Sequence, residues 1–162
     1  MTSNYAEQAR ARKLADALSC GIDDAFISRL VDSFYDSIRQ DDMLGPIFAE
    51  RIGDWPHHLA RMKDFWASIM LESGRFSGNP MRKHIAIGKL DEAHFVRWRS
   101  LWDQTLCRIA PSGAVADKFR EAAQRIGESL LAGIRIDRGD LGAISAKERH
   151  DARSLYRLTD LP

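Results

Sequence analysis

The sequence predicts an all-α protein. Apolar residues recur at spacings of three and four along several long segments, as in helices that bury one face. No segment shows the strict alternation of apolar and polar residues that is typical of a strand. The 162 residues suit one domain, and a content of 44% hydrophobic and 29% charged residues is typical of a globular chain.

The first two predicted helices lie before residue 40. Residues 4–19 are polar and helix-prone, and we expect them to form an N-terminal extension. Asp23 or Asp24 can cap the next helix, whose apolar residues mark one face through Ile38. Tyr35 lies on that inward face, so its hydroxyl is expected to need a buried hydrogen-bond partner.

The middle of the chain predicts a turn and then a helix that carries two histidines. The Gly-Pro pair at residues 45–46 indicates a turn. A helix is expected to begin at Asp54, with Pro56 in its first turn. His58 shares the apolar face of that helix, whereas His57 is turned about 100° away and is expected to meet solvent.

A short helix is predicted after a glycine-rich break. In GRFSGNPMRKHIAI, Asn79 is a suitable N-cap and Pro80 a suitable first residue, so a helix through His84 is expected. Two longer helices follow, one from Asp91 to about residue 110 and one over residues 114–136. We therefore divide the chain into an N-terminal helical extension (1–22), a main domain (23–138) and a tail (139–162). In the tail Ser145 and Glu148 fit a capping box, so a short C-terminal helix is expected.

The histidines have no spacing that by itself defines a metal site. No pair matches a zinc finger, and the HExxH motif is absent. From the pattern alone, His84 is a surface or capping residue or a metal ligand, and His58 is a half-buried core histidine or a site residue. Aromatic and methionine side chains surround both positions, and they are core packing or the wall of an apolar pocket. A flat apolar cofactor with a reactive centre, such as an iron porphyrin, suits that second interpretation.

Four blocks of the sequence resemble a known family. FYDSIRQDDMLGPIF, DWPHHLARMKDFW, GRFSGNPMRKH and HFVRWRSLW are similar, in type and in order, to group III truncated haemoglobins, a branch of bacterial globins. The resemblance runs from about Phe26 to Leu106. It implies a truncated globin fold, which is a two-over-two helical sandwich around haem b.

The resemblance also implies roles for individual residues. His84 corresponds to the proximal iron ligand, and Tyr35, His58 and Trp98 correspond to the distal residues that face a bound ligand. A shift of the helix start by one residue would make His57 compete with His58. Arg75, Arg82 and Lys83 are candidates to bind the haem propionates. The remaining predicted cofactor contacts are Phe34, Phe48, Met62, Trp66, Met81 and Phe95.

The expected function is reversible binding of O2, NO or CO. The alternative is a haem enzyme, either an NO dioxygenase or a peroxidase-like protein, and a haem-free globin-like domain is a third hypothesis. The chain has no GxGxxG motif, so an enzyme would need an external reductase. A net charge of +1 predicts neither a nucleic acid nor a membrane partner. The two distant cysteines and the absence of a signal-like start predict a cytoplasmic protein, and the oligomeric state stays open.

Overall fold

The computed structural model describes residues 2–140, 142 and 150, and no strand occurs among them. The predicted helical character of the chain is therefore confirmed. The helices are α1 (Thr2–Ser19), α2 (Asp24–Gln40), α3 (Gly45–Arg51), α4 (Trp55–Leu71), α5 (Pro80–Ile85), α6 (Glu92–Ile109) and α7 (Gly113–Asp137).

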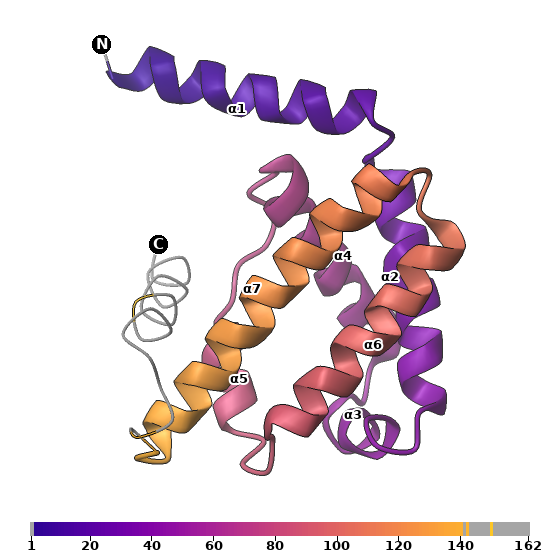
Figure 1. Ribbon diagram of the computed structural model, residues 1–162, viewed down its shortest axis with the longest axis vertical. Coiled ribbons are helices and arrows are strands. Elements are labelled where there is room, and N and C mark those ends of the chain that lie inside the picture. Colours follow the sequence, from indigo (N-terminus) through magenta and orange to yellow (C-terminus); the bar gives the residue numbers. More distant parts are fainter. Residues whose placement is uncertain (1, 141, 143–149, 151–162) are drawn as a thin grey trace.

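Four long helices form two layers. α2 packs against α4, α6 packs against α7, and α2 also packs against α6, which joins the layers. In Figure 1, α6 and α7 lie in front of α2 and α4. This arrangement agrees with the two-over-two sandwich that the family resemblance implied. The short helices α3 and α5 complete the fold, with α3 packed on α2 and α5 packed on α7.

The apolar interior is divided into two clusters of buried side chains. The larger lies among α2, α4, α6 and α7, where Trp102 is buried and donates a hydrogen bond from Nε1 to the Phe119 carbonyl at 3.3 Å. Ile126 of α7 is only partly buried and packs against both clusters. The smaller cluster lies around α5 and consists of Ile47, Met81, Leu90, Phe95, Leu130 and Ile134.

The segment around Gly45 and Pro46 forms a helix, where the sequence analysis expected only a turn. Proline lacks an N–H and has a fixed φ, so it is well suited to the first turn of a helix, and here it begins α3. A Cβ on Gly45 would lie 3.0 Å from the Arg39 carbonyl oxygen, so glycine allows α3 to start directly against the end of α2. Phe48 is thereby placed on a helix.

Side-chain caps fix where the helices of the candidate site begin. Asp54 accepts a hydrogen bond from the His57 N–H at 3.0 Å at the start of α4. Asn79 accepts one from the Arg82 N–H at 2.9 Å and begins α5. These caps confirm the predicted starts of both helices, and they fix the direction in which each histidine projects.

The N-terminal helix α1 lies apart from the layers. It crosses one end of the molecule in Figure 1 and contacts α4. From Asn4 onward Ala17 is its buried side chain, and Lys13 forms an ion pair with Glu72 at 2.8 Å. The division into an extension, a main domain and a tail stays a prediction, and the expected helix at residues 145–148 lies outside the described residues. Among the described helices, none is both long and apolar enough to cross a membrane.

Two glycines of α7 give a matched test of how closely α5 packs. An added Cβ at Gly127 would meet Phe95 at 3.6 Å, an ordinary contact, whereas at Gly133 it would lie 2.2 Å from Met81 Sδ. We expect Gly127→Ala to raise the free energy of unfolding by up to about 1 kcal/mol through helix propensity. Gly133→Ala should lower it by about 1–3 kcal/mol because the buried Met81 must move. Urea unfolding of both variants checks this, and equal effects would contradict the packing described for α5.

Candidate functional site

Tyr35 lies among three other aromatic rings, and the four rings together come from three helices. Its ring centroid lies 5.8 Å from that of Phe48 on α3, 6.1 Å from Trp55 and 5.2 Å from His58, both on α4. All three contacts are edge-to-face, the favourable geometry for aromatic pairs. We call Tyr35, Phe48, Trp55 and His58 the distal cluster. It brings together Tyr35, Phe48 and His58, which were predicted as site residues from separate parts of the sequence.

The hydroxyl of Tyr35 is uncharged, and the residue is buried. The residue is 7% exposed, and burial raises the pKa of the phenol well above its usual value. Within the described part of the chain, this hydroxyl takes part in no hydrogen bond. An uncharged phenol without an internal partner retains its O–H as a donor for a molecule bound beside it.

His58 has a buried nitrogen without a partner. Its Nε2 is inaccessible to solvent and forms no hydrogen bond within the described part of the chain. Burial lowers the pKa of this imidazole, and the positive charges of Arg61, His57 and Lys83 lower it further. The ring is therefore neutral near pH 7, so one nitrogen donates and the other accepts. Leaving a buried polar atom unpaired costs about 1–3 kcal/mol, which is typical of a site that awaits a ligand.

The structure separates the two adjacent histidines. His57 is exposed at the start of α4, and His58 points at the Tyr35 ring. The helix face identified from the sequence therefore has His58 as its inward histidine.

Trp98 and Trp66 occupy different surroundings. Trp98 is partly exposed and meets the Phe34 ring edge-to-face at 5.9 Å. Trp66 is buried in the larger cluster, where it stacks on Trp102 at 4.5 Å. The ring contacts of Trp66 are with Phe65, Trp102 and Phe119, and none is with the distal cluster.

The other predicted cofactor contacts divide between the two apolar clusters. Phe34 is fully buried in the larger cluster, against which Phe48 and Met62 pack while partly exposed. Met81 and Phe95 are buried together in the smaller cluster. The structure thus places predicted contacts in both clusters.

The imidazole of His84 is oriented by its own helix. Its Nδ1 lies 2.7 Å from the carbonyl oxygen of Pro80, one turn earlier in α5. A carbonyl can only accept, so Nδ1 carries the proton and donates. Burial lowers the pKa of His84, and the hydrogen bond to Pro80 only partly opposes this effect. The neutral ring therefore leaves Nε2 as a free lone pair, which is the form of histidine that binds a metal.

Helix α5 is held in place by its neighbour on α7. Met81 is 1% exposed and lies against Gly133, where the missing side chain of the glycine makes room for it. Lys83 is near enough to His58 for its charge to lower the pKa of that histidine. The short helix that carries His84 thus packs on α7, with its Lys83 within electrostatic range of His58 on α4.

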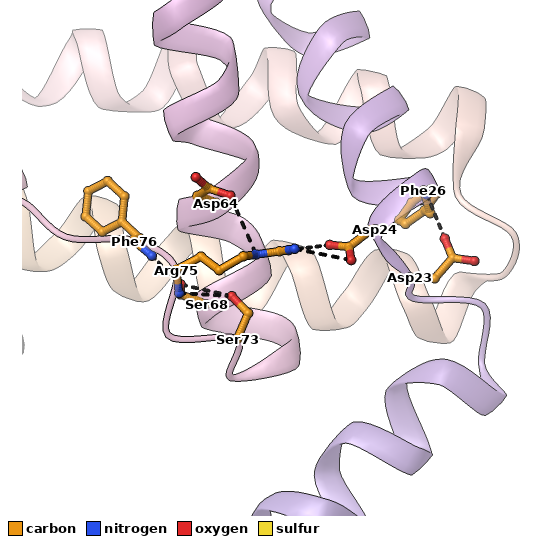
Figure 2. Close-up of polar contacts among 8 residues, drawn as sticks. All are labelled: Asp23, Asp24, Phe26, Asp64, Ser68, Ser73, Arg75 and Phe76. Carbon is orange, nitrogen blue, oxygen red and sulfur yellow. Dashed lines mark hydrogen bonds and ion pairs between the residues drawn. The ribbon is translucent and has the colours of Figure 1, made fainter.

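The loop before α5 is attached to both α2 and α4. Figure 2 shows Arg75 between Asp24 of α2 and Asp64 of α4, with ion-pair distances of 2.5 and 3.6 Å. The Phe76 N–H donates to Ser68 Oγ of α4 at 3.1 Å, also drawn in Figure 2. Arg61 of α4 donates to the Ser77 carbonyl at 2.7 Å. These contacts fix the path of the chain from α4 into α5.

The three cations that were predicted to bind the propionates differ in whether they already form ion pairs. Arg75 is already paired with two carboxylates. Arg82 and Lys83 are exposed, and within the described residues neither side chain forms a hydrogen bond or an ion pair. Their charges are therefore available to an anionic group at the edge of the site.

Two features of the site were not predicted from the sequence. One is Trp55, although its position three residues before His58 was an available signal. The other is Arg39, whose guanidinium lies 4.5 Å from the centre of the Trp55 ring. A partner sixteen positions away on another helix leaves no periodic signal.

His58 and His84 predict a pH-dependent stability of the haem-free protein. Their folded-state pKa values are lowered, so below about pH 6.5 the unfolded chain binds protons that the folded chain does not. The free energy of unfolding should be constant just above pH 6.5 and fall from there towards pH 5, by at most about 1.4 kcal/mol per pH unit for each histidine. Urea titrations at several pH values measure how steeply the free energy of unfolding changes with pH. That pH dependence should be weaker in His58→Gln and in His84→Gln. An unchanged pH dependence in both variants would contradict the lowered pKa values.

Comparisons with known proteins agree with this geometry. No family model matches the chain. The group 3 truncated hemoglobin ctb of Campylobacter jejuni is 34% identical over 84 residues, which span 49% of this chain and 66% of the relative, just under two thirds of its length. The crystal structure of a group III truncated hemoglobin from Campylobacter jejuni matches with a TM-score of 0.65 and 29% identity, over 68% of this chain and 89% of that chain. In both sequence and fold, the chain is therefore similar to group III truncated haemoglobins.

Proposed function

We propose that this protein binds haem b through His84 and holds O2, or another diatomic ligand such as NO or CO, beside the distal cluster. One observation carries the proposal. His84 is neutral, its Nδ1 is bonded to the Pro80 carbonyl, and its Nε2 lone pair is free. That combination fixes both the tautomer and the direction of the ring.

The residues present fit a haem. The unpartnered Nε2 of His58 and the free hydroxyl of Tyr35 are polar groups that a ligand would satisfy. Apolar side chains that are only partly buried pack against both core clusters, and such side chains could form the walls of a porphyrin site. They include Phe48, Leu59, Met62, Trp98, Ile126 and Leu131.

The role of the distal residues follows from their protonation. Ferrous haem would supply an open coordination position that takes a diatomic ligand and places partial negative charge on it. Tyr35 supplies an O–H donor, and Trp98 supplies an indole N–H that has no internal hydrogen bond in the described part of the chain. Each donor is worth roughly 1–2 kcal/mol in a dry site, so two donors slow ligand release by about 100-fold.

The rim cations support a choice among the predicted propionate contacts. Arg82 and Lys83 on α5 have no internal partner in the described structure, whereas Arg75 is paired with Asp24 and Asp64. We therefore assign propionate binding to Arg82 and Lys83, and a structural role to Arg75.

An enzymatic activity is the second candidate. A neutral, unpartnered imidazole beside a phenol O–H can accept a proton from peroxide while the phenol donates, so His58 and Tyr35 favour a peroxidase-like reaction. The same donors would serve an NO dioxygenase. Either activity needs an external reductase or reducing substrate, and steady turnover with one would support it.

Absorption spectra test the cofactor assignment. Protein produced with ample haem should show a Soret band that changes when CO is added to the ferrous form. His84→Ala should lose stable haem binding because no other imidazole replaces its Nε2. The matched control is His57→Ala, which removes an exposed histidine next to His58 and should retain haem. A wild-type protein without a Soret band would support the haem-free alternative, and full retention by His84→Ala would contradict the ligand assignment.

A second prediction concerns ligand release. Tyr35→Phe removes one hydroxyl and keeps the ring that packs against Phe48 and His58. We expect O2 to dissociate roughly tenfold faster, with little change in haem retention. Stopped-flow displacement of O2 by CO measures this rate, and an unchanged rate would remove Tyr35 from the ligand site.

A further inference from the structure

A buried carboxylate closes the corner between α2 and α3. The side chain of Asp41 is 4% exposed and directly follows α2. Its Oδ1 accepts hydrogen bonds from the N–H groups of Met43 at 3.1 Å and Leu44 at 2.9 Å. Its backbone N–H donates to the Ile38 carbonyl, and its own carbonyl accepts from the Gly45 N–H at 2.8 Å. Asp41 therefore joins the end of one helix to the start of the next.

The second oxygen of the same carboxylate holds α6. Oδ2 accepts a hydrogen bond from Nε of Arg97 at 2.6 Å and forms an ion pair with its Nη2, also at 2.6 Å. Burial alone would raise the pKa of Asp41, but the hydrogen bonds from Arg97 and the backbone outweigh it and lower the pKa. The carboxylate is charged near neutral pH and accepts three hydrogen bonds besides its ion pair, so much of the free-energy cost of burying it is offset.

The three helices that meet at Asp41 carry three residues of the distal side. Arg97 is followed on α6 by Trp98, whose ring edge meets Phe34 of α2 at 5.9 Å and 90°. Phe34 is followed by Tyr35. α3 carries Phe48, whose ring lies 5.8 Å from that of Tyr35. A change in the angle or register of α6 or α3 relative to α2 would therefore move the distal groups relative to one another.

We infer that Asp41 and Arg97 form a positioning pair that sets the Trp98 indole and the Phe48 ring relative to the Tyr35 hydroxyl, and so tunes the retention of a diatomic ligand. The inference rests on the proposed function for the ligand, but the positioning itself belongs to the protein alone. Neither residue is in the distal cluster, and their effect on the ligand acts through Trp98 and Phe48.

The first arm of the test needs no haem. Asp41→Asn keeps the shape of the side chain and removes its charge, and Arg97→Gln removes the guanidinium. In the ¹H–¹⁵N spectrum of the haem-free protein, both changes should shift the indole N–H signal of Trp98, identified by its loss in Trp98→Phe. Asp103→Asn is the matched control, since Asp103 pairs with Arg120 and links α6 to α7. It should leave that signal in place.

The second arm measures ligand release from the haem-bound protein. Both variants should release O2 roughly threefold to tenfold faster than wild type, and the control should not. The double variant Asp41→Asn/Arg97→Gln should match the single variants, because the pair acts as a unit. The lysine variant Arg97→Lys, which keeps the charge, should restore part of the wild-type rate.

The outcomes separate the two claims. An unmoved Trp98 signal in both variants would overturn the positioning pair. So would a double variant whose acceleration of O2 release equals the product of the two single-variant accelerations. If Asp41→Asn does not fold, Arg97→Gln carries the test, because the Arg97 side chain is 42% exposed and its loss leaves less buried surface unpaired. If wild-type protein binds no haem, the proposed function fails, and the haem-free spectrum still decides whether Asp41 and Arg97 position Trp98.

Discussion

The hydrogen bond from His84 Nδ1 to the Pro80 carbonyl is the interaction on which the proposed chemistry depends. It assigns the proton to one ring nitrogen and leaves the other free. The bond exists because α5 begins at Pro80, four residues before His84, so that the carbonyl lies one turn below the ring. Asn79 fixes that beginning through its cap. A helix start shifted by one residue would turn the imidazole away.

A six-residue helix is too short to be stable alone, so its position comes from its surroundings. Met81 attaches it to α7, and the Arg75 ion pairs and the Ser68 contact attach the preceding loop to α2 and α4. Exposed ion pairs are individually weak, so we regard the buried Met81 contact as the stronger attachment. The distal side is organised differently, by aromatic edges around Tyr35 and by the charged pair at Asp41.

Much of the fold could be predicted from the sequence because helical periodicity and caps are local signals. The inward positions of Tyr35 and His58 followed from spacing alone, and the start of α5 followed from Asn79 and Pro80. Helix α3 was missed because a Gly-Pro pair signals both a turn and a helix start, and the carboxylate that caps this corner also depends on a distant arginine.

The chemistry of the site was less accessible to sequence reasoning. Nothing local distinguishes Arg75, which meets a carboxylate fifty-one residues earlier, from Arg82, which has no partner in the described structure. The acceptor for the second nitrogen of His84 became evident only once the turn of α5 was in place. The side chains of the distal cluster suit both the retention of a diatomic ligand and peroxide chemistry, because the same O–H donor and neutral imidazole serve both.

The most direct test of the account is a resonance Raman spectrum of the ferrous protein labelled with ¹⁵N-histidine. One iron–imidazole stretching band that moves with the label is expected, because His84 is proposed as the iron ligand and His58 as a free distal group. A spectrum without that band would contradict the account, and so would a six-coordinate spectrum with two histidine ligands.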